Sequence, residues 1–119
     1  MTNLEKEFIY LSQLVFDFTE EETLEDIKEA GGLVRVNLEG GDYIYYGADG
    51  TPFALNSVHF FDALVSKKIL EPVKFPTDAD INKPTFQKDF DKAFSISRER
   101  LTKYLENLRS DIASGKIAI

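Results

Sequence analysis

Hydrophobic and polar residues alternate in the middle of the chain, and this period of two predicts a small antiparallel sheet. Apolar side chains alternate partly with Arg35 and Asn37 in a first run, and aromatic and β-branched residues fill a second run. Pro52 lacks an amide hydrogen, so a third short run around it belongs at a strand start or a sheet edge. The predicted elements are three strands within about residues 33–55, joined by glycine-containing turns at Glu39–Asp42 and Gly47–Gly50.

The first thirty residues instead place hydrophobic side chains every three or four positions, which predicts two helices. Thr2 and Glu5 have the spacing of a capping box. Thr19 and Glu22 have the same spacing, and the glycines at 31–32 supply the end of the second helix. The first helix has a wide apolar face, made of Leu4, Phe8, Leu11, Val15 and Phe18 and widened by Ile9, Leu14 and Phe16. Such a face predicts a central core helix, with a face shared with a partner as the alternative.

Two further helices are predicted after the sheet. Ser57 is placed to N-cap the first of them, and Pro72 prevents its continuation. The last begins at Pro84 and ends near Gly115. Its apolar residues stay on one face and comprise Phe86, Phe90, Phe94, Leu101, Tyr104, Leu105, Leu108 and Ile112. The polar Ser95–Ser97 segment interrupts that face, so a kink there is the alternative to a continuous helix.

These elements predict an α+β fold in a single domain, in which helices cover a short three-stranded antiparallel sheet. The expected organisation is an acidic helical segment at 1–30, a β-meander plus helix at 31–70, an extended linker at 71–83 and a C-terminal helix at 84–115. The last helix is longer than a domain of 119 residues is wide, so part of its apolar face should outrun the core. We therefore expect a homo-oligomer, because self-association would bury that part.

Charge is distributed unevenly along the chain. Residues 1–30 contain nine acidic and two basic residues, whereas residues 31–119 contain twelve of each, so the formal net charge of −7 resides in the first quarter. Nucleic acids and anionic membranes both attract basic groups, so neither is an expected partner. The expected partner is a protein with a basic surface. The acidic start also lacks the basic flank of a signal peptide and no run has the length of a membrane span, so we expect a cytoplasmic protein.

Four carboxylates form one ridge on the predicted second helix, and we call them the acidic ridge. They are Glu22, Glu25, Asp26 and Glu29, at helical spacings of three and four. One interpretation is a solvated helix face, and the other is a docking surface for a basic partner.

Tyrosines on the second strand offer a second candidate surface. Tyr43 and Tyr45 share one face of that strand. If Ile44 faces the core, the two tyrosines are an exposed aromatic pair that can anchor a partner or, with Arg35, line a ligand pocket. The alternative is cross-strand packing over Arg35 within the fold.

Side chains that support catalysis or metal binding do not cluster in the sequence. His59 is the only histidine and there is no cysteine, so disulfides are excluded and a histidine-based metal site lacks further ligands. Ser57 and His59 are two residues apart and would point to different sides of a helix. The glycine turns match no phosphate-binding loop. We expect no catalytic residue, no metal, no cofactor and no enzymatic activity.

The resulting functional hypothesis is a small acidic, non-enzymatic interaction protein that binds and inhibits or regulates another protein, of inhibitor or immunity type. The helix–hairpin–helix order from Leu24 to Leu70 resembles the compact cassettes of phage or plasmid regulators, which implies such an origin. One alternative is a module that binds or sequesters a small molecule. Another is a compact DNA-binding regulator, supported locally by Lys67 and Lys68.

Overall fold

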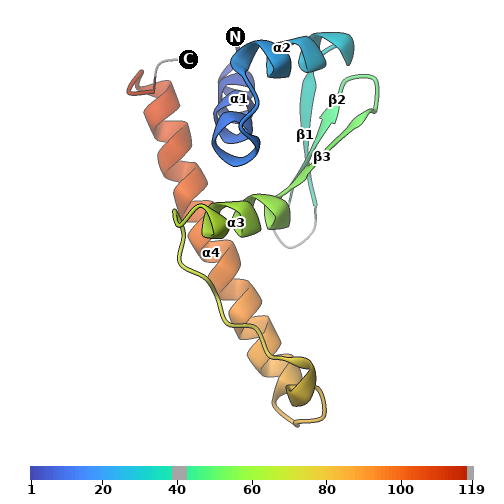
Figure 1. The fold of residues 1–119 in the computed structure, drawn as a ribbon, viewed down its shortest axis with the longest axis vertical. Helices are drawn as coiled ribbons and strands as arrows, with labels where there is room; N and C mark the ends of the chain where they lie inside the picture. Colours follow the sequence, from blue (N-terminus) through green and yellow to red (C-terminus); the bar gives the residue numbers. More distant parts are fainter. Residues whose placement is uncertain (39–42, 118–119) are drawn as a thin grey trace.

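Four α-helices and a three-stranded sheet form the part of the chain that the computed structural model describes, residues 1–38 and 43–117 (Figure 1). For residues 54–57 it describes the backbone alone. The predicted α+β class is confirmed. The elements are α1 (Asn3–Phe16), α2 (Glu20–Glu29), β1 (Leu33–Asn37), β2 (Tyr43–Gly47), β3 (Pro52–Asn56), α3 (Ser57–Ser66), the 3₁₀-helix η2 (Asp78–Asp80) and α4 (Phe86–Ala113).

Side-chain caps set the starts of the first two helices. The Glu5 amide donates to Thr2 Oγ1 at 3.1 Å and the Thr2 amide donates to Glu5 Oε1 at 3.3 Å, so the predicted capping box is confirmed. At α2 the Glu22 amide donates to Thr19 Oγ1 at 3.1 Å, which is one half of the second predicted box. Gly31 ends α2 in the left-handed conformation (φ +78°), as predicted.

Two helix boundaries differ from the prediction. α1 ends at Phe16 because Asp17 takes the left-handed conformation (φ 57°), so Phe18 leaves the helical face. α4 begins at Phe86, two residues after Pro84. It runs without interruption past Ser95–Ser97, so the continuous helix is confirmed and the kink is not.

The sheet is an antiparallel meander in the order β1-β2-β3. The predicted turn at Glu39–Asp42 lies outside the described residues. The second turn closes with a hydrogen bond from the Gly50 amide to the Gly47 carbonyl at 3.0 Å. A Cβ at Gly47 would lie 2.4 Å from the Ala30 Cβ, so this strand end packs against the end of α2 only because residue 47 is glycine.

The two faces of the sheet carry side chains opposite to those expected for a half-buried strand, with valines outside and an arginine inside. Val34 and Val36 point outward and are exposed, whereas Arg35 lies opposite Tyr45 on the inner face. The exposed-pair interpretation of Tyr43 and Tyr45 is therefore wrong: both tyrosines are buried, and packing over Arg35 is confirmed. The reason is that the large aromatic rings bury more apolar area than the valines would.

The core forms where α1 lies between the sheet and the second half of α4, with α3 across the bottom (Figure 1). The central-helix interpretation of α1 is confirmed, because Phe8, Ile9 and Leu11 are buried. The other elements contribute Ile27, Tyr43, Tyr45, Phe60, Phe61, Leu64, Leu101, Leu105, Leu108 and Ile112.

The first half of α4 extends beyond this core. Only Ala93 among its described residues 86–100 is buried, and the molecule measures 49 × 31 × 23 Å. The segment before η2 runs back along this half of the helix (Figure 1). Phe75 packs against Phe90 with ring centroids 5.6 Å apart, and Arg100 donates to the Glu71 and Pro72 carbonyls. The predicted linker is thus a strap that partly covers the apolar face of α4.

Candidate functional site

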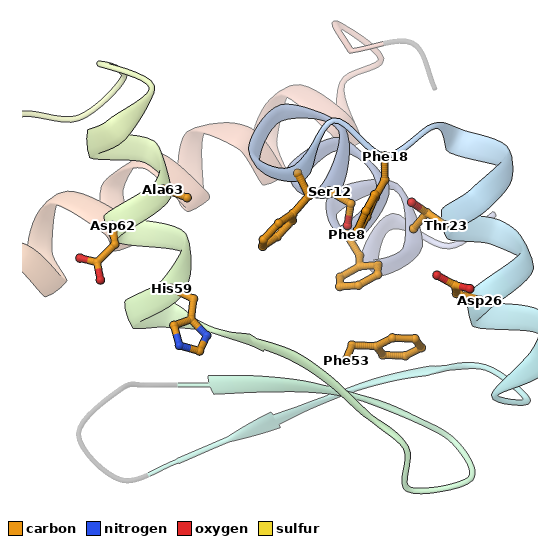
Figure 2. A pocket seen from close by; sticks show the side chains of 10 residues that line it. Phe8, Ser12, Phe18, Thr23, Asp26, Phe53, His59, Asp62 and Ala63 are labelled. Atoms are coloured by element: carbon orange, nitrogen blue, oxygen red, sulfur yellow. The ribbon is translucent and has the colours of Figure 1, made fainter.

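A pocket of about 620 Å³ opens between α1, α2, β3 and α3 (Figure 2). We call it the phenylalanine pocket, because Phe8, Phe16, Phe18 and Phe53 line it. The remaining lining residues are Ser12, Thr23, Asp26, His59, Asp62 and Ala63. No sequence motif pointed to this pocket, because its lining comes from four elements that are distant in the chain.

Helical spacing explains how each element presents its side chains to the pocket. Phe8 and Ser12 are four residues apart on α1, and Thr23 and Asp26 are three apart on α2, so each pair shares a helix face. The left-handed turn at Asp17 then brings Phe18 back against Phe16, with ring centroids 5.6 Å apart. Phe16 and Phe18 are 36% and 46% exposed, so this pair forms the rim and Phe8 the floor.

The polar side chains of the pocket are two hydroxyls, two carboxylates and one imidazole, from Ser12, Thr23, Asp26, Asp62 and His59. Ser12 is 1% exposed, and its Oγ, directed between the phenylalanine rings, has no hydrogen-bond partner within the described part of the chain (Figure 2). Buried hydroxyls are nearly always paired, so this one is an exception that calls for a reason. Asp26 lies on the α2 side and His59 on the α3 side (Figure 2), and the lining includes no lysine or arginine.

The acidic ridge is solvent-exposed on α2. All four carboxylate residues, Glu22, Glu25, Asp26 and Glu29, are exposed, and none forms an ion pair with a described residue. Other acids do find cations: Asp80 lies 2.8 Å from Lys83 Nζ, and Asp17 lies 3.5 Å from Lys67 Nζ. The ion pair with Lys83 and hydrogen bonds from Thr77 hold the pKa of the Asp80 carboxyl well below its usual range. Asp26 belongs to both the ridge and the phenylalanine pocket.

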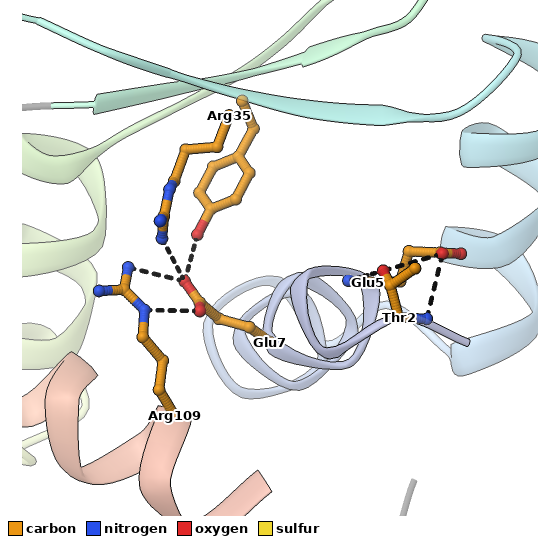
Figure 3. Close-up of polar contacts among 6 residues, drawn as sticks. Thr2, Glu5, Glu7, Arg35 and Arg109 are labelled. Carbon is orange, nitrogen blue, oxygen red and sulfur yellow. Dashed lines mark hydrogen bonds and ion pairs between the residues drawn. The ribbon is translucent and has the colours of Figure 1, made fainter. Parts of the chain in front are cut away.

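A second polar cluster is buried around Glu7 (Figure 3). Its carboxylate is 3% exposed, accepts a 2.6 Å hydrogen bond from the Tyr45 hydroxyl and a 2.8 Å bond from Arg109 Nε, and lies 3.6 Å from Arg35. Hydrogen bonding to Glu7 raises the pKa of Arg109. Burial, and then the Glu7 charge, raises the pKa of the Tyr45 hydroxyl far above its ordinary value. The cluster joins α1, the sheet and α4.

The candidate site residues from the sequence therefore separate in space. The acidic ridge is on the surface, whereas Tyr43, Tyr45 and Arg35 belong to the sheet's inner face and pack next to Glu7. As core residues, the two tyrosines cannot be the exposed anchors of a partner-binding surface. Sequence reasoning missed Glu7 and Ser12, and one signal was available: both are polar residues among the apolar positions of the first helix.

Residues 1–38 and 43–117 contain no group of three or more His, Cys, Asp or Glu side chains placed to hold a metal ion. No helix in the same residues combines the length and the apolar character needed to cross a bilayer.

Comparison of the chain with protein-family models, with curated proteins and with solved structures finds no match.

Proposed function

We propose that the protein is a small acidic, non-enzymatic interaction protein that binds a protein with a basic surface and so inhibits or regulates it. The observation that carries this proposal is the acidic ridge: four exposed carboxylates on one helix that form no ion pair with a described residue. Like charges at spacings of three and four on a helix destabilise it slightly. A partner that supplies the missing cations would remove that repulsion.

The position of the ridge suits an interface. Exposed Phe16 and Phe18 stand beside α2, so the charged helix borders an aromatic pair. Protein interfaces often combine aromatic anchors with a charged rim that steers the approach of the partner. Ridge charges would act mainly on the association rate and would be screened by salt.

The test removes the ridge charges without changing side-chain size. The variant Glu22→Gln/Glu25→Gln/Glu29→Gln keeps Asp26, and therefore keeps the phenylalanine pocket intact. A matched control, Asp89→Asn/Glu99→Gln/Glu106→Gln, removes three exposed carboxylates from α4 and changes the net charge equally. Immobilised wild type should capture a basic protein from a host lysate at about 0.05 M salt and release it at about 0.5 M.

The association rate of the purified partner is then measured with wild type, the ridge variant and the control variant. We expect the ridge variant to slow association about tenfold and the control variant to leave it near the wild-type rate. Equal rates for the ridge variant and wild type would contradict a docking role and leave a solvated helix face. A large loss of stability in the ridge variant would contradict both interpretations.

The DNA-binding alternative gains nothing from the structure. Lys67, one of its two supporting residues, lies 3.5 Å from the Asp17 carboxylate. The ligand-binding alternative cannot use the tyrosines as an open pocket, because both are buried. It gains support at a different place, the phenylalanine pocket.

A further inference from the structure

The phenylalanine pocket has the features of a small-molecule site, although it shares Asp26, Phe16 and Phe18 with the proposed docking surface. We infer that it binds an organic cation with an apolar, ring-sized body and a protonated amine. Three observations carry this inference: the size and apolar lining of the pocket, the buried Ser12 hydroxyl, and the sign of the charges at its edge.

Size and lining set the body of the ligand. A volume of about 620 Å³ lies within the range of small-molecule pockets, roughly 300–1,000 Å³. Four phenylalanine rings supply its walls, and Ala63 on α3 leaves room beside them. An apolar ring inserted among these side chains would bury surface that Phe16 and Phe18 now expose to water.

The Ser12 hydroxyl sets one polar contact. A serine hydroxyl has one donor hydrogen and two acceptor lone pairs. Ser12 is only 1% exposed, and its Oγ forms no hydrogen bond within the described part of the chain. Leaving such a group unpaired costs free energy that a hydrophobic residue at this position would avoid. A polar atom of a bound ligand would supply the missing partner.

Charge sets the class of the ligand. Asp26 on α2 and Asp62 on α3 belong to the lining, and no lysine or arginine does. Figure 2 shows the Asp26 carboxylate directed towards the rings and the Asp62 carboxylate directed away from them. Aromatic ring faces also attract cations. A ligand carboxylate would meet the like charge of Asp26 and only His59 as a basic side chain, whereas a protonated amine would meet opposite charge and the negative faces of the rings.

The test uses three matched probes on the full chain. These are phenethylamine, which carries a protonated amine, neutral 2-phenylethanol and anionic phenylacetate. Each is titrated into ¹⁵N-labelled protein, and amide shifts are followed by NMR. We expect millimolar binding, because each probe has few atoms, and an affinity order of amine, then alcohol, then acid. The largest shifts should fall in α1 near Ser12, in α2 near Asp26 and in α3 near Ala63.

Variants separate charge from shape. Asp26→Asn should weaken phenethylamine about fivefold and leave 2-phenylethanol within twofold, since one exposed carboxylate contributes under 1 kcal/mol. Glu29→Gln on the same helix, outside the pocket, is the control and should change neither. Ala63→Leu should abolish the shifts of all three probes by filling the space, and its own spectrum shows whether it remains folded.

Each contrary outcome overturns the inference. If phenylacetate bound as tightly as phenethylamine or more tightly, the inference that the ligand is a cation would be wrong. If the amide shifts fell outside α1, α2 and α3, the inferred location of the site would be wrong. Because the ridge variant of the docking test retains Asp26, it should bind phenethylamine at least half as tightly as wild type. Failure of the docking proposal and failure of this inference are thus distinguishable.

Discussion

At the scale of single residues, the buried Glu7 carboxylate is held by two guanidinium groups and one phenol hydroxyl. Arg109 provides two hydrogen bonds at 2.8 and 3.2 Å, and Arg35 provides a second positive charge at 3.6 Å. A buried charge is tolerated only when such partners replace the water it has lost. The arrangement explains why Arg35 points inward on β1 while the neighbouring valines face solvent.

Tyr45 gives this cluster a measurable pH dependence. Burial raises the Tyr45 pKa far above the ordinary value of 10.0, so above about pH 10 the unfolded chain loses a proton that the folded chain retains. The free energy of unfolding should therefore be unaffected by this group below pH 10 and should fall as the pH rises beyond it, by up to about 1.4 kcal/mol per pH unit. Burial also raises the pKa of Tyr104 to about 12, which adds to the loss between pH 10 and 12.

Urea unfolding of wild type and Tyr45→Phe between pH 8 and about 12 measures this slope. The variant should be less stable at pH 8, because Glu7 loses a hydrogen bond, yet its stability should decline less steeply above pH 10. Identical slopes for the two proteins would show that Tyr45 ionises in the folded state much as it does in the unfolded chain.

At the scale of elements, all four helices end at a residue with positive φ, and in α1 this residue is Asp17 (φ 57°), directly after the last helical residue. After α2, α3 and α4 the residue with positive φ stands two positions past the last helical residue, and the next amide donates to the carbonyl five residues back. Gly31 and Gly115 fill this position after α2 and α4, but Lys68 (φ 61°) fills it after α3. A lysine pays a steric penalty for this conformation that glycine does not.

Replacing that lysine should therefore stabilise the protein. We expect Lys68→Gly to raise the free energy of unfolding by about 1 kcal/mol, measured by urea or thermal unfolding. The reciprocal control is Gly115→Ala, where a Cβ would meet open space but φ is +79°, and it should cost a similar amount. A decrease in stability for Lys68→Gly would mean that the lysine side chain contributes more than its backbone strain costs.

The elements were largely predictable, and the reasons are local. Caps at Thr2 and Thr19, the glycine ends of α2 and α4 and the continuous apolar face of α4 depend on neighbours within a few residues. The inner face of the sheet was not predictable, because Arg35 is drawn inward by Glu7, which lies 28 residues earlier in the sequence. The phenylalanine pocket needs four elements placed in space, and the end of α1 at Asp17 depends on a backbone conformation that aspartate does not require.

The whole molecule is more extended than its length implies. Its radius of gyration is 16.2 Å, whereas a compact chain of this length has about 13.5 Å. The excess comes from the first half of α4, where Phe86, Phe90 and Phe94 stack along the helix. The strap covers this stack in part through Phe75 against Phe90, and the Arg98 guanidinium lies over the Phe94 ring at 4.5 Å. Phe90 remains 38% exposed.

This shape leads us to keep the prediction of self-association. Light scattering at micromolar concentrations should report a homo-oligomer for wild type, and Phe90→Glu should shift it towards monomer by placing a charge in the apolar face. Val36→Glu, on the exposed outer face of the sheet, is the control and should leave the oligomer intact. A wild type that is monomeric throughout would mean that the strap suffices, and disruption by Val36→Glu alone would move the interface to the sheet.

The Glu7 cluster also limits how early the chain can fold while it is being synthesised on the ribosome. Arg109 follows Glu7 by 102 residues, and Tyr45 follows it by 38. Before α4 has been synthesised, burying α1 would leave the Glu7 carboxylate without its two hydrogen bonds from Arg109. This cost opposes packing of α1 against the sheet. The nascent N-terminal part therefore gains little from folding early, and completion of the core awaits the last turns of the final helix.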